Sequence, residues 1–519
     1  MISKYQKIYT ILFLSSLFLF LINFLVQGKI FFDYEDSLGL ILKMGGIFWF
    51  GFLILLILIF FHYSNFKKID ENYVYLTFTL LIIYLIGTPF FYEHVPRFPD
   101  TWSHSYLANE MFKTGKVING IDSYEQYPGA FLFFGLLFQI LPYYEIMLFF
   151  PIFIYVLGII VIYLLFKNLI NSRISYLSSI LYIFFNWTVE DNHLSPQFLM
   201  LFVYFVFMFI LVKMLTEDKN KKKYALFFLI MSPVIVFSHP GLPIFLFFIL
   251  GSMLILCKKL RFTILAVFLF LGLCFTIHTV LFTTETGSYK TYVENFIKSL
   301  STGQFSQITQ SFKTSFTFRE VFLYSRLGIT LFSVIFGILG LIVMFKNKYS
   351  TGAKFLFSWA FSMMLFVIFV GIVLKGQFYE RFALISSLPL AALTVYFLEE
   401  AKIHVSYIFI IFLVITPVYF IAKYGNEAFE SVSLQKLRAT CYYYTQNPDC
   451  YQKEIVDNKL IVGIDGIGKT SFVVSREDEI WNSVYLDKDL NVIRDSLEQL
   501  AIERKLNRIY STDISVVYG

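Results

Sequence analysis

The chain has 519 residues, of which 57% are hydrophobic, 20% are aromatic and only 15% are charged, and its mean hydropathy is +0.69. This composition excludes a water-soluble globular protein of this size and is typical of a chain embedded in lipid. The net charge of +6 is modest, and the lysines cluster in short segments between apolar runs. That pattern indicates membrane orientation and argues against nucleic-acid binding.

Thirteen apolar runs are predicted to cross a membrane as helices. A hydrocarbon core of about 30 Å requires roughly 20 helical residues, and fewer where the bilayer thins. The predicted spans are 9–26, 45–62, 73–92, 146–166, 174–187, 198–215, 224–237, 242–257, 262–282, 327–345, 355–374, 383–398 and 404–422. The apolar segment 129–141 is not counted because its 13 residues rise only about 20 Å as a helix. We expect it to lie half-buried in the membrane surface.

This assignment gives one consistent orientation by the positive-inside rule. The basic clusters 67–68, 167–173, 219–223, 258–261 and 346–354 all fall on the side of the N-terminus, which is predicted to be cytoplasmic. Residues 1–422 are therefore predicted to form a multi-pass domain of the cell membrane, with a large outer loop at 93–145.

The outer loop begins with a long polar stretch, 93–129, which gathers ionisable groups that the neighbouring runs lack. Such a concentration indicates chemistry or recognition. Asp100 is predicted to cap a helix over 101–112, with His104 one turn later on the same face. A carboxylate in this place can act as a general base on a hydroxyl group. The alternatives are a solvated helix cap and a packed surface histidine.

Other polar segments share the outer side, at 190–197, 238–241, 283–326 and 375–381. Lys375 and Arg381 are candidates for neutralising a phosphate at the bilayer surface, and the alternative is that Arg381 merely pairs with Glu380. His193 and His239 each precede a proline and fit either an outer-face contact or a helix end. The residues expected to make further outer-face contacts are Arg97, Tyr127, Glu190, Asp191, His193, Gln197, His239 and Glu380.

After residue 422 the chain becomes rich in charged residues, and 423–519 is predicted to be a small extracytoplasmic α/β domain with a helix over 491–505. Cys441 and Cys450 can pair there or remain free thiols. The stretch 463–470, GIDGIGKT, matches the phosphate-binding loop of nucleotide-binding proteins. The following SFVVSREDEIW is β-like and acidic where a helix should begin, so we expect no ATP binding.

The order of features in the outer loop resembles that of the GT-C superfamily of membrane glycosyltransferases, especially the protein mannosyltransferase and aminoarabinose transferase type. These features are Asp100, a helix with the small Ala108, Thr114-Gly115, and Tyr127-Pro128 opening the half-buried segment. The resemblance covers about 91–213 and beyond that is one of general architecture.

Several features depart from the family pattern. Thr101 follows Asp100 where the family often has a second acidic residue, and Gly129 follows Tyr127-Pro128 where a second proline is common. Two spans precede the one that feeds the loop, which is also atypical. The WWDYG signature of oligosaccharyltransferases is absent from the sequence, which disfavours transfer of a whole oligosaccharide to asparagine.

The resemblance implies a glycosyltransferase that moves a sugar from a polyprenyl-phosphate donor to an acceptor hydroxyl on a protein, lipid or glycan at the outer membrane face. It implies that Asp100 is the catalytic base, that His104 helps to position the acceptor, and that Arg381 and Lys375 bind the donor phosphate. No cofactor is predicted; Asp122 and Glu125 leave a divalent metal open, although their spacing is ordinary for a loop.

The alternative function is a transporter or flippase of lipid-linked glycans. Transporters usually carry charges near the middle of the bilayer and show two matching halves. The predicted spans carry almost no charge in their interiors, and the sequence shows no internal repeat. A receptor or scaffold with an outer binding domain is the third function considered.

Overall fold

The computed structural model describes most of the membrane-embedded part of the chain and three strands near its C-terminus. The described residues are 3–30, 38–93, 96, 98–117, 126–188, 193–217, 219–239, 241–256, 261–282, 318–346, 351–373, 379–424, 472–475, 508–511 and 515–518.

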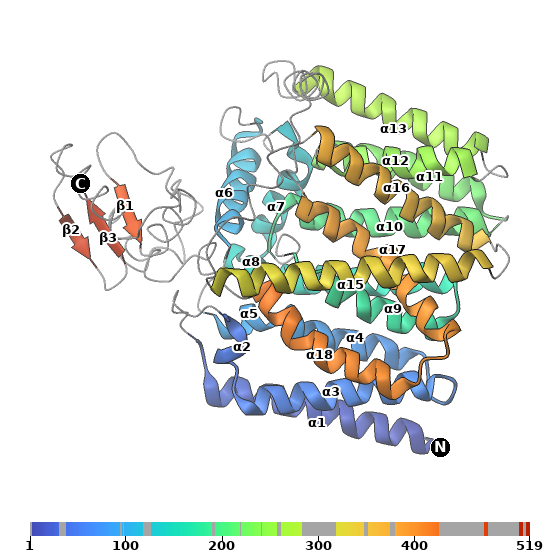
Figure 1. Ribbon diagram of the computed structural model, residues 1–519. Coiled ribbons are helices and arrows are strands. Elements are labelled where there is room, and N and C mark those ends of the chain that lie inside the picture. Colours follow the sequence, from blue (N-terminus) through green and yellow to red (C-terminus); the bar gives the residue numbers. More distant parts are fainter. Residues whose placement is uncertain are drawn as a thin grey trace.

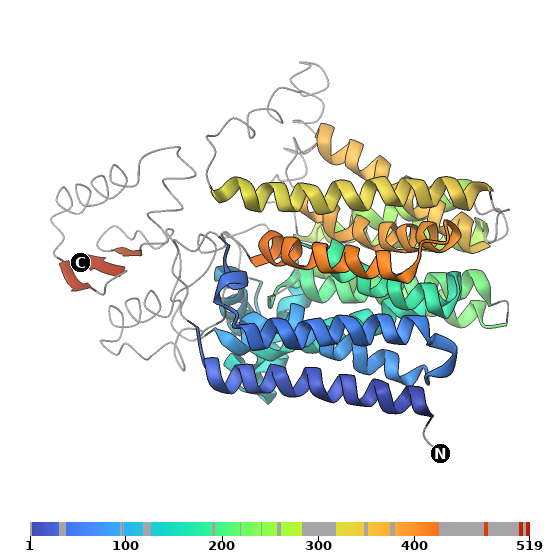
Figure 2. The ribbon, with the colours of Figure 1, turned by 60° about the horizontal axis from the view of Figure 1, so that its bottom comes forward.

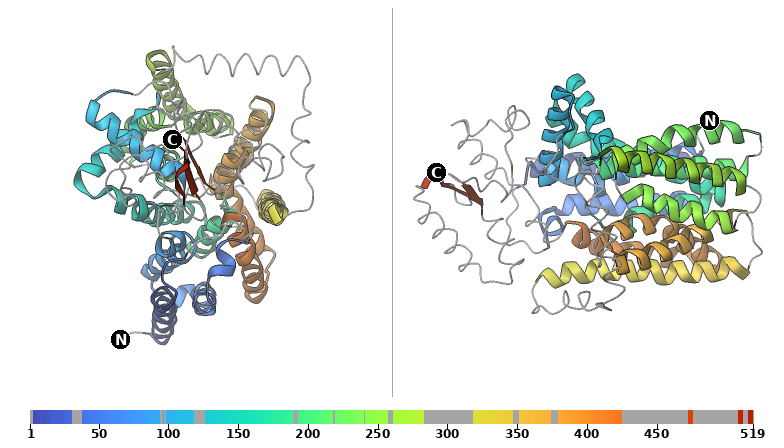
Figure 3. Two further views of the ribbon diagram at one scale, coloured as in Figure 1. Left: turned by 90° about the vertical axis from the view of Figure 1, so that its left-hand side faces the viewer. Right: turned by 90° about the horizontal axis from the view of Figure 1, so that it is seen from above.

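The architecture is a bundle of long helices that run side by side (Figure 1). The helices are α1 (Lys4–Gln27), α2 (Leu40–Lys43), α3 (Gly46–Ser64), the 3-10 helix η1 (Phe66–Lys68), α4 (Asn72–Leu85), α5 (Thr88–Tyr92), α6 (Pro99–Thr114), α7 (Pro128–Ile140), α8 (Tyr143–Leu169), α9 (Ser172–Phe185), α10 (Pro196–Thr216), α11 (Lys221–Ser238), α12 (Gly241–Leu256), α13 (Arg261–Phe282), α15 (Phe318–Lys346), α16 (Thr351–Val373), α17 (Tyr379–Glu400) and α18 (Val405–Tyr424). The bundle is elongated in cross-section, with α1 at one margin and α13 at the opposite one (Figures 1 and 3).

Several of these helices are long and apolar enough to cross a membrane. Within the described residues there are 7 such helices, namely α1, α3, α8, α10, α13, α15 and α18. Every predicted span overlaps a helix of the structure, and the count of thirteen crossings itself stays a prediction. The chain is a multi-pass helical membrane protein.

The predicted span 73–92 is not one helix. The structure divides it into α4 and α5 at Ile86 and Gly87. Pro89 stands in the first turn of α5, where its missing N–H group costs nothing, whereas in a continuous helix the same residue would remove a hydrogen bond. The proline therefore favours a new helix start over an unbroken span.

Helices α6 and α7 lie at one end of the bundle, with their axes across the direction of the long helices (Figures 1 and 3). Helix α7 corresponds to the segment that we predicted to be too short to span, and it is a helix of 13 residues. Gly135 of α7 lies directly against α6, because an added Cβ would stand 2.6 Å from the Ala108 carbonyl oxygen and 2.6 Å from the Phe112 Cβ. This glycine lets the two helix backbones approach closely.

Helices α15 and α17 run side by side (Figures 1 and 2), and they also meet through glycines. A Cβ on Gly340 would lie 1.9 Å from the Leu393 carbonyl oxygen, and one on Gly337 would lie 2.5 Å from the Leu390 Cδ2. Small residues at such a crossing are how helices pack in lipid, where no water is expelled by their association.

The end of the bundle opposite α6 and α7 carries ion pairs between basic and acidic side chains. Lys167 Nζ lies 2.5 Å from Glu71 Oε1, and Arg173 Nε lies 3.5 Å from Glu399 Oε1. Burial raises the pKa of Glu71, but the hydrogen bonds from Lys167 and Tyr163 and the charge of Lys167 together outweigh it, so the pKa of Glu71 is lowered. Three of the four residues are substantially exposed, which limits each pair to a small contribution to stability.

Near the C-terminus the described residues form an antiparallel sheet of β1 (Phe472–Ser475), β2 (Arg508–Ser511) and β3 (Ser515–Tyr518), in the order β1-β3-β2. Phe472 pairs with Tyr518, and Ser475 pairs with Ser515. A strand thus follows GIDGIGKT almost at once, as the β-like pattern predicts. The predicted helix 491–505, the GIDGIGKT segment itself, Cys441 and Cys450 lie outside the described residues.

Candidate functional site

Helix α6 carries the residues that the sequence placed at the centre of the site. It begins at Pro99, with Phe98 as its N-cap residue, and it ends at Thr114, where the C-cap residue Gly115 has a φ of 63° in the left-handed region. The prediction that Asp100 caps a helix starting at 101 is therefore wrong, because proline at the first position starts the helix two residues earlier. Asp100 belongs to the first helical turn, and His104 follows one turn later on the same face. The structure describes the backbone of Asp100 and not its side chain.

His104 meets a segment that lies far away in the sequence. Its Nδ1 is 3.4 Å from the carbonyl oxygen of Leu194, which is 90 positions further along the chain. Its ring lies parallel to that of His193, with centroids 6.4 Å apart and an angle of 7° between the planes. Both histidines are buried. The structure thus brings together two predicted site residues, one from α6 and one from the segment before α10.

Aromatic rings and a helix cap hold this contact in place. The Phe98 ring is 5.0 Å from that of His193, and the Phe131 ring of α7 is 5.7 Å from that of His104. The Ser195 hydroxyl accepts a hydrogen bond of 3.1 Å from the Phe198 N–H and so caps α10. Gln197, another predicted contact, is buried in the first turn of α10. The His104–His193 contact is therefore held by Phe98 next to His193 and by Phe131 next to His104.

Tyr127 contacts a histidine that the sequence analysis missed. Its ring stacks on that of His278 in α13, with centroids 4.5 Å apart. His278 Nε2 lies 2.8 Å from the Gln126 carbonyl oxygen, and the Phe237 ring meets the imidazole edge-on. His278 stands near the end of an apolar run, and a lone polar residue in such a run is the only signal by which the sequence could have identified it. Tyr127 thereby anchors the start of α7 to the bundle.

His239 lies at a helix end. Its Nδ1 accepts hydrogen bonds from the Gly241 N–H at 3.0 Å and from the Leu242 N–H at 3.2 Å. Because backbone N–H groups can only donate, Nδ1 must be the unprotonated nitrogen in this arrangement. The helix-end alternative considered for His239 is the one found, with the side chain capping the start of α12.

The start of the outer loop is tied to the end of α1. Lys29 Nζ donates a hydrogen bond of 2.8 Å to the Glu93 carbonyl oxygen, and the Ile30 N–H donates one of 2.6 Å to the Tyr92 carbonyl oxygen. Burial lowers the pKa of Lys29, and the charge of Glu93 opposes this shift. Helix α1, the first of the two spans that precede the one leading into the loop, therefore helps to hold the start of the loop in place.

Two cations that the sequence analysis missed are buried at the same end of the bundle. Lys423 Nζ donates to the carbonyl oxygens of Asn186, at 3.2 Å, and Thr188, at 2.8 Å. Arg326 Nε donates to the Ala422 carbonyl oxygen at 2.9 Å, and its guanidinium lies over the Trp187 ring at 4.7 Å. Both cations occur at the ends of apolar runs, where membrane helices commonly carry a lysine or arginine, so their positions did not mark them as site residues.

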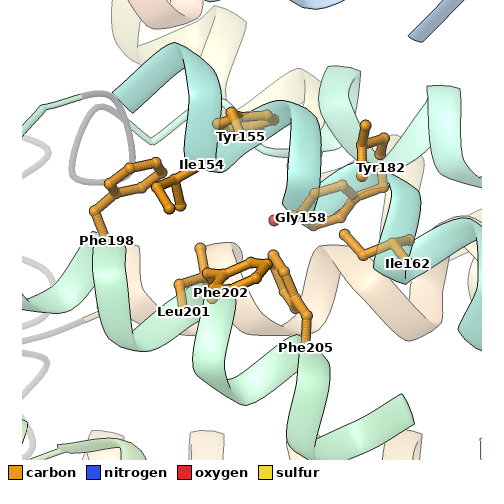
Figure 4. Close-up of a pocket in the computed structure, with 10 residues that line it drawn as sticks. Ile154, Tyr155, Gly158, Ile162, Tyr182, Phe198, Leu201, Phe202 and Phe205 are labelled. Atoms are coloured by element: carbon orange, nitrogen blue, oxygen red, sulfur yellow. The ribbon is translucent and has the colours of Figure 1, made fainter. Parts of the chain in front are cut away.

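An apolar pocket lies between α8, α9 and α10 (Figure 4). Its empty volume is about 240 Å³, which includes the space at its open side. The lining residues are Ile154, Tyr155, Gly158, Ile159, Ile162, Tyr182, Phe198, Leu201, Phe202 and Phe205. Asn186 Nδ2 lies 3.3 Å from the hydroxyls of Tyr155 and Tyr182. The pocket is therefore apolar along its length, with an amide group near the two tyrosine hydroxyls.

The remaining predicted site residues are only partly covered by the structure. Arg97, Asp122, Glu125, Glu190, Asp191 and Lys375 lie outside the described residues. Glu380 and Arg381 belong to the first turn of α17, and only their backbone is described. Among the residues that the structure describes, no three or more His, Cys, Asp or Glu side chains are grouped closely enough to hold a metal ion.

Comparisons with known proteins give a match at the level of the fold. No family model matches the chain, and no curated protein matches it. Among solved structures, the chain is similar to the Archaeoglobus fulgidus oligosaccharyltransferase tethered with an acceptor peptide containing the NVT sequon. The TM-score is 0.50 with 15% identity, and the match covers 76% of this chain and 59% of the other.

A second structure of the A. fulgidus enzyme, AglB with an inhibitory peptide and a dolichol-phosphate, matches with a TM-score of 0.45 at 15% identity, covering 75% of this chain and 60% of the other. The chain spans about three fifths of the length of these neighbours. The fold assignment rests on the first of the two matches, and it agrees with the resemblance in the outer loop. The chain shares the fold of the A. fulgidus oligosaccharyltransferase.

Proposed function

We propose that this protein is a glycosyltransferase that moves a sugar from a polyprenyl-phosphate donor to an acceptor hydroxyl at the outer face of the cell membrane. The observation that carries the proposal is the meeting of α6 with the segment before α10, at one end of a GT-C fold. It places His104 and His193 together beside the helical turn that contains Asp100. Such a site lies where a lipid-linked donor and a water-soluble acceptor can meet.

Each proposed role follows from the chemistry of the side chain. Asp100 takes the proton of the acceptor hydroxyl as it attacks the sugar carbon, and His104 orients that hydroxyl. The bond between the sugar and the phosphate breaks, and polyprenyl phosphate leaves. Arg381 and Lys375 bind that phosphate and stabilise its negative charge. Arg97, Glu190, Asp191, Gln197 and Glu380 are proposed as further contacts on the outer face.

The acceptor is proposed to be a hydroxyl group on a protein, lipid or glycan. The similar A. fulgidus enzyme was solved with an acceptor peptide, so a peptide is the first acceptor to test. This chain lacks the WWDYG signature and is expected to use a serine or threonine hydroxyl in a peptide, and not an asparagine amide.

The orientation is proposed from charge. Lys167 and Arg173 lie at the end of the bundle opposite α6 and α7, and the other basic clusters of the sequence fall on the same side. By the positive-inside rule this end is cytoplasmic. The N-terminus is then cytoplasmic, and α6, α7 and the domain at 423–519 are extracytoplasmic.

The proposed function is tested by incubating the purified protein in lipid vesicles with a polyprenyl-phosphate sugar and a hydroxyl-containing peptide. We expect release of free polyprenyl phosphate together with sugar on the peptide, and a parallel sample with a chelator shows whether a divalent metal takes part. Movement of the intact lipid-linked sugar between leaflets, with no cleavage, would instead identify a flippase. A protein that neither cleaves nor moves the lipid would refute both functions.

The apolar pocket between α8, α9 and α10 is proposed to hold part of the donor's prenyl tail. An added Cβ on Gly158 would lie 3.4 Å from the Phe205 Cδ2, so Gly158→Leu places a side chain inside the pocket. We expect the KM for the donor to rise about tenfold with little change in kcat, because the substitution weakens donor binding equally in the ground state and in the transition state. Gly272→Leu is the matched control, because Gly272 also faces a phenylalanine of a neighbouring helix, at 3.8 Å. Equal donor KM values for the two variants would place the tail elsewhere.

A further inference from the structure

Arg326 and Lys423 bind the backbone at the outer ends of two helices. We call these two residues the cation clamp. The last carbonyl groups of a helix have no partner within the helix and carry a partial negative charge. Lys423 donates to carbonyl oxygens just beyond the end of α9, and Arg326 donates to a carbonyl oxygen in the last turn of α18. Each cation therefore binds carbonyl oxygens at or just beyond the end of one helix, from a position on a neighbouring helix.

The clamp joins parts of the chain that are distant in sequence. Lys423 is 237 positions from Asn186, and Arg326 is 96 positions from Ala422. Trp187 links the two contacts, because its ring lies under the Arg326 guanidinium while its Nε1 donates a hydrogen bond of 3.0 Å to Thr330 Oγ1. Asn186, Trp187, Thr188 and Lys423 are all fully buried. The chain leaving α9 is thus fixed by both α15 and α18.

The fixed residues lead directly into the candidate site. Only a few residues separate Thr188 from His193, whose ring lies against His104. The far end of the same segment is held where Ser195 caps α10. A shift at Thr188 is therefore expected to displace His193 and the Leu194 carbonyl oxygen relative to α6.

We propose that the cation clamp, Arg326 and Lys423, positions residues 186–188, and through them His193 and Leu194, for catalysis without binding the substrate itself. The catalytic part of this inference rests on the proposed function, whereas the structural part does not.

The structural part is tested by hydrogen exchange on the full-length protein in lipid. Lys423→Met keeps a long flexible side chain but removes the charge and the hydrogen-bond donors. We expect exchange in 186–199 to become about tenfold faster or more, with exchange in α7 unchanged. Lys219→Met, which changes an exposed lysine at the opposite end of the bundle, is the control. Unchanged exchange in 186–199 would overturn the inference, and this result requires no substrate.

The catalytic part is tested by separating kcat from KM. For Lys423→Met we expect kcat to fall about tenfold, with the donor KM close to that of the wild type, because a displaced segment weakens transition-state contacts and not donor binding. Lys423→Arg keeps a cation and donors at the site and is expected to restore much of the rate. A raised donor KM with an unchanged kcat would mean that Lys423 binds the donor phosphate directly, and would overturn the positioning role.

Discussion

Asp100→Asn is expected to lower the rate of sugar transfer by about 10²–10⁴-fold, the usual contribution of a general base. Asparagine has nearly the shape of aspartate but cannot accept the proton of the attacking hydroxyl. The residue lies in the first turn of α6, one turn before His104, and His104 is fixed by the Leu194 carbonyl oxygen and the His193 ring. The measurement is kcat/KM for transfer from a polyprenyl-phosphate sugar.

A second carboxylate on the same helix provides the control for Asp100. Glu110 lies near the C-terminal end of α6 and is partly exposed, so Glu110→Gln makes the same chemical change away from the His104–His193 contact. We expect this variant to keep the wild-type rate. Both variants should elute as a single species in detergent and unfold at similar temperatures, because each substitution nearly keeps the shape of the side chain. An undiminished rate for Asp100→Asn would remove Asp100 from the mechanism.

The sequence predicted the helices well because apolar runs and basic clusters report directly on the bilayer. Segment 129–141 was left out of the predicted membrane spans, and this agrees with α7, a helix of 13 residues that lies across the end of the bundle. The two errors of detail, the division of 73–92 and the start of α6, were both caused by proline. In each case a proline that fits the first turn of a helix determined a boundary that hydropathy alone does not mark.

The site was predicted as separate residues and not as an arrangement. His104 and His193 were each candidates, but nothing in one sequence shows that positions so far apart have parallel rings. His278, Arg326 and Lys423 were missed for a different reason. They lie inside or at the ends of apolar runs, where a single polar side chain has no pattern around it, and their partners are backbone carbonyl oxygens far away in the sequence. Such partners carry no signal in the sequence.

Gly135→Leu is expected to reduce transfer about 100-fold even though Gly135 touches no proposed substrate group, because small misplacements of reacting groups are costly. A Cβ at this position would stand 2.6 Å from the Ala108 carbonyl oxygen and 2.6 Å from Phe112 Cβ, and neither atom belongs to a flexible side-chain end. Helix α6 must therefore move away from α7 and carry Asp100 and His104 with it. Overpacking of this kind costs about 1–3 kcal/mol, which a multi-pass protein can tolerate without unfolding.

The same substitution at Gly46, where an added Cβ meets nothing within 4 Å, separates this effect from a general effect of leucine in a helix. We expect Gly46→Leu to keep its activity and Gly135→Leu to lose it, with both proteins folded. Gly135→Ala, which adds only the Cβ, should fall between them. If Gly135→Leu transferred sugar at the wild-type rate, the placement of α6 against α7 could not control the reaction, and the catalytic group would have to lie on another element. The outcome therefore tests whether the active site depends on the close contact between α6 and α7 as well as on the side chains that these helices carry.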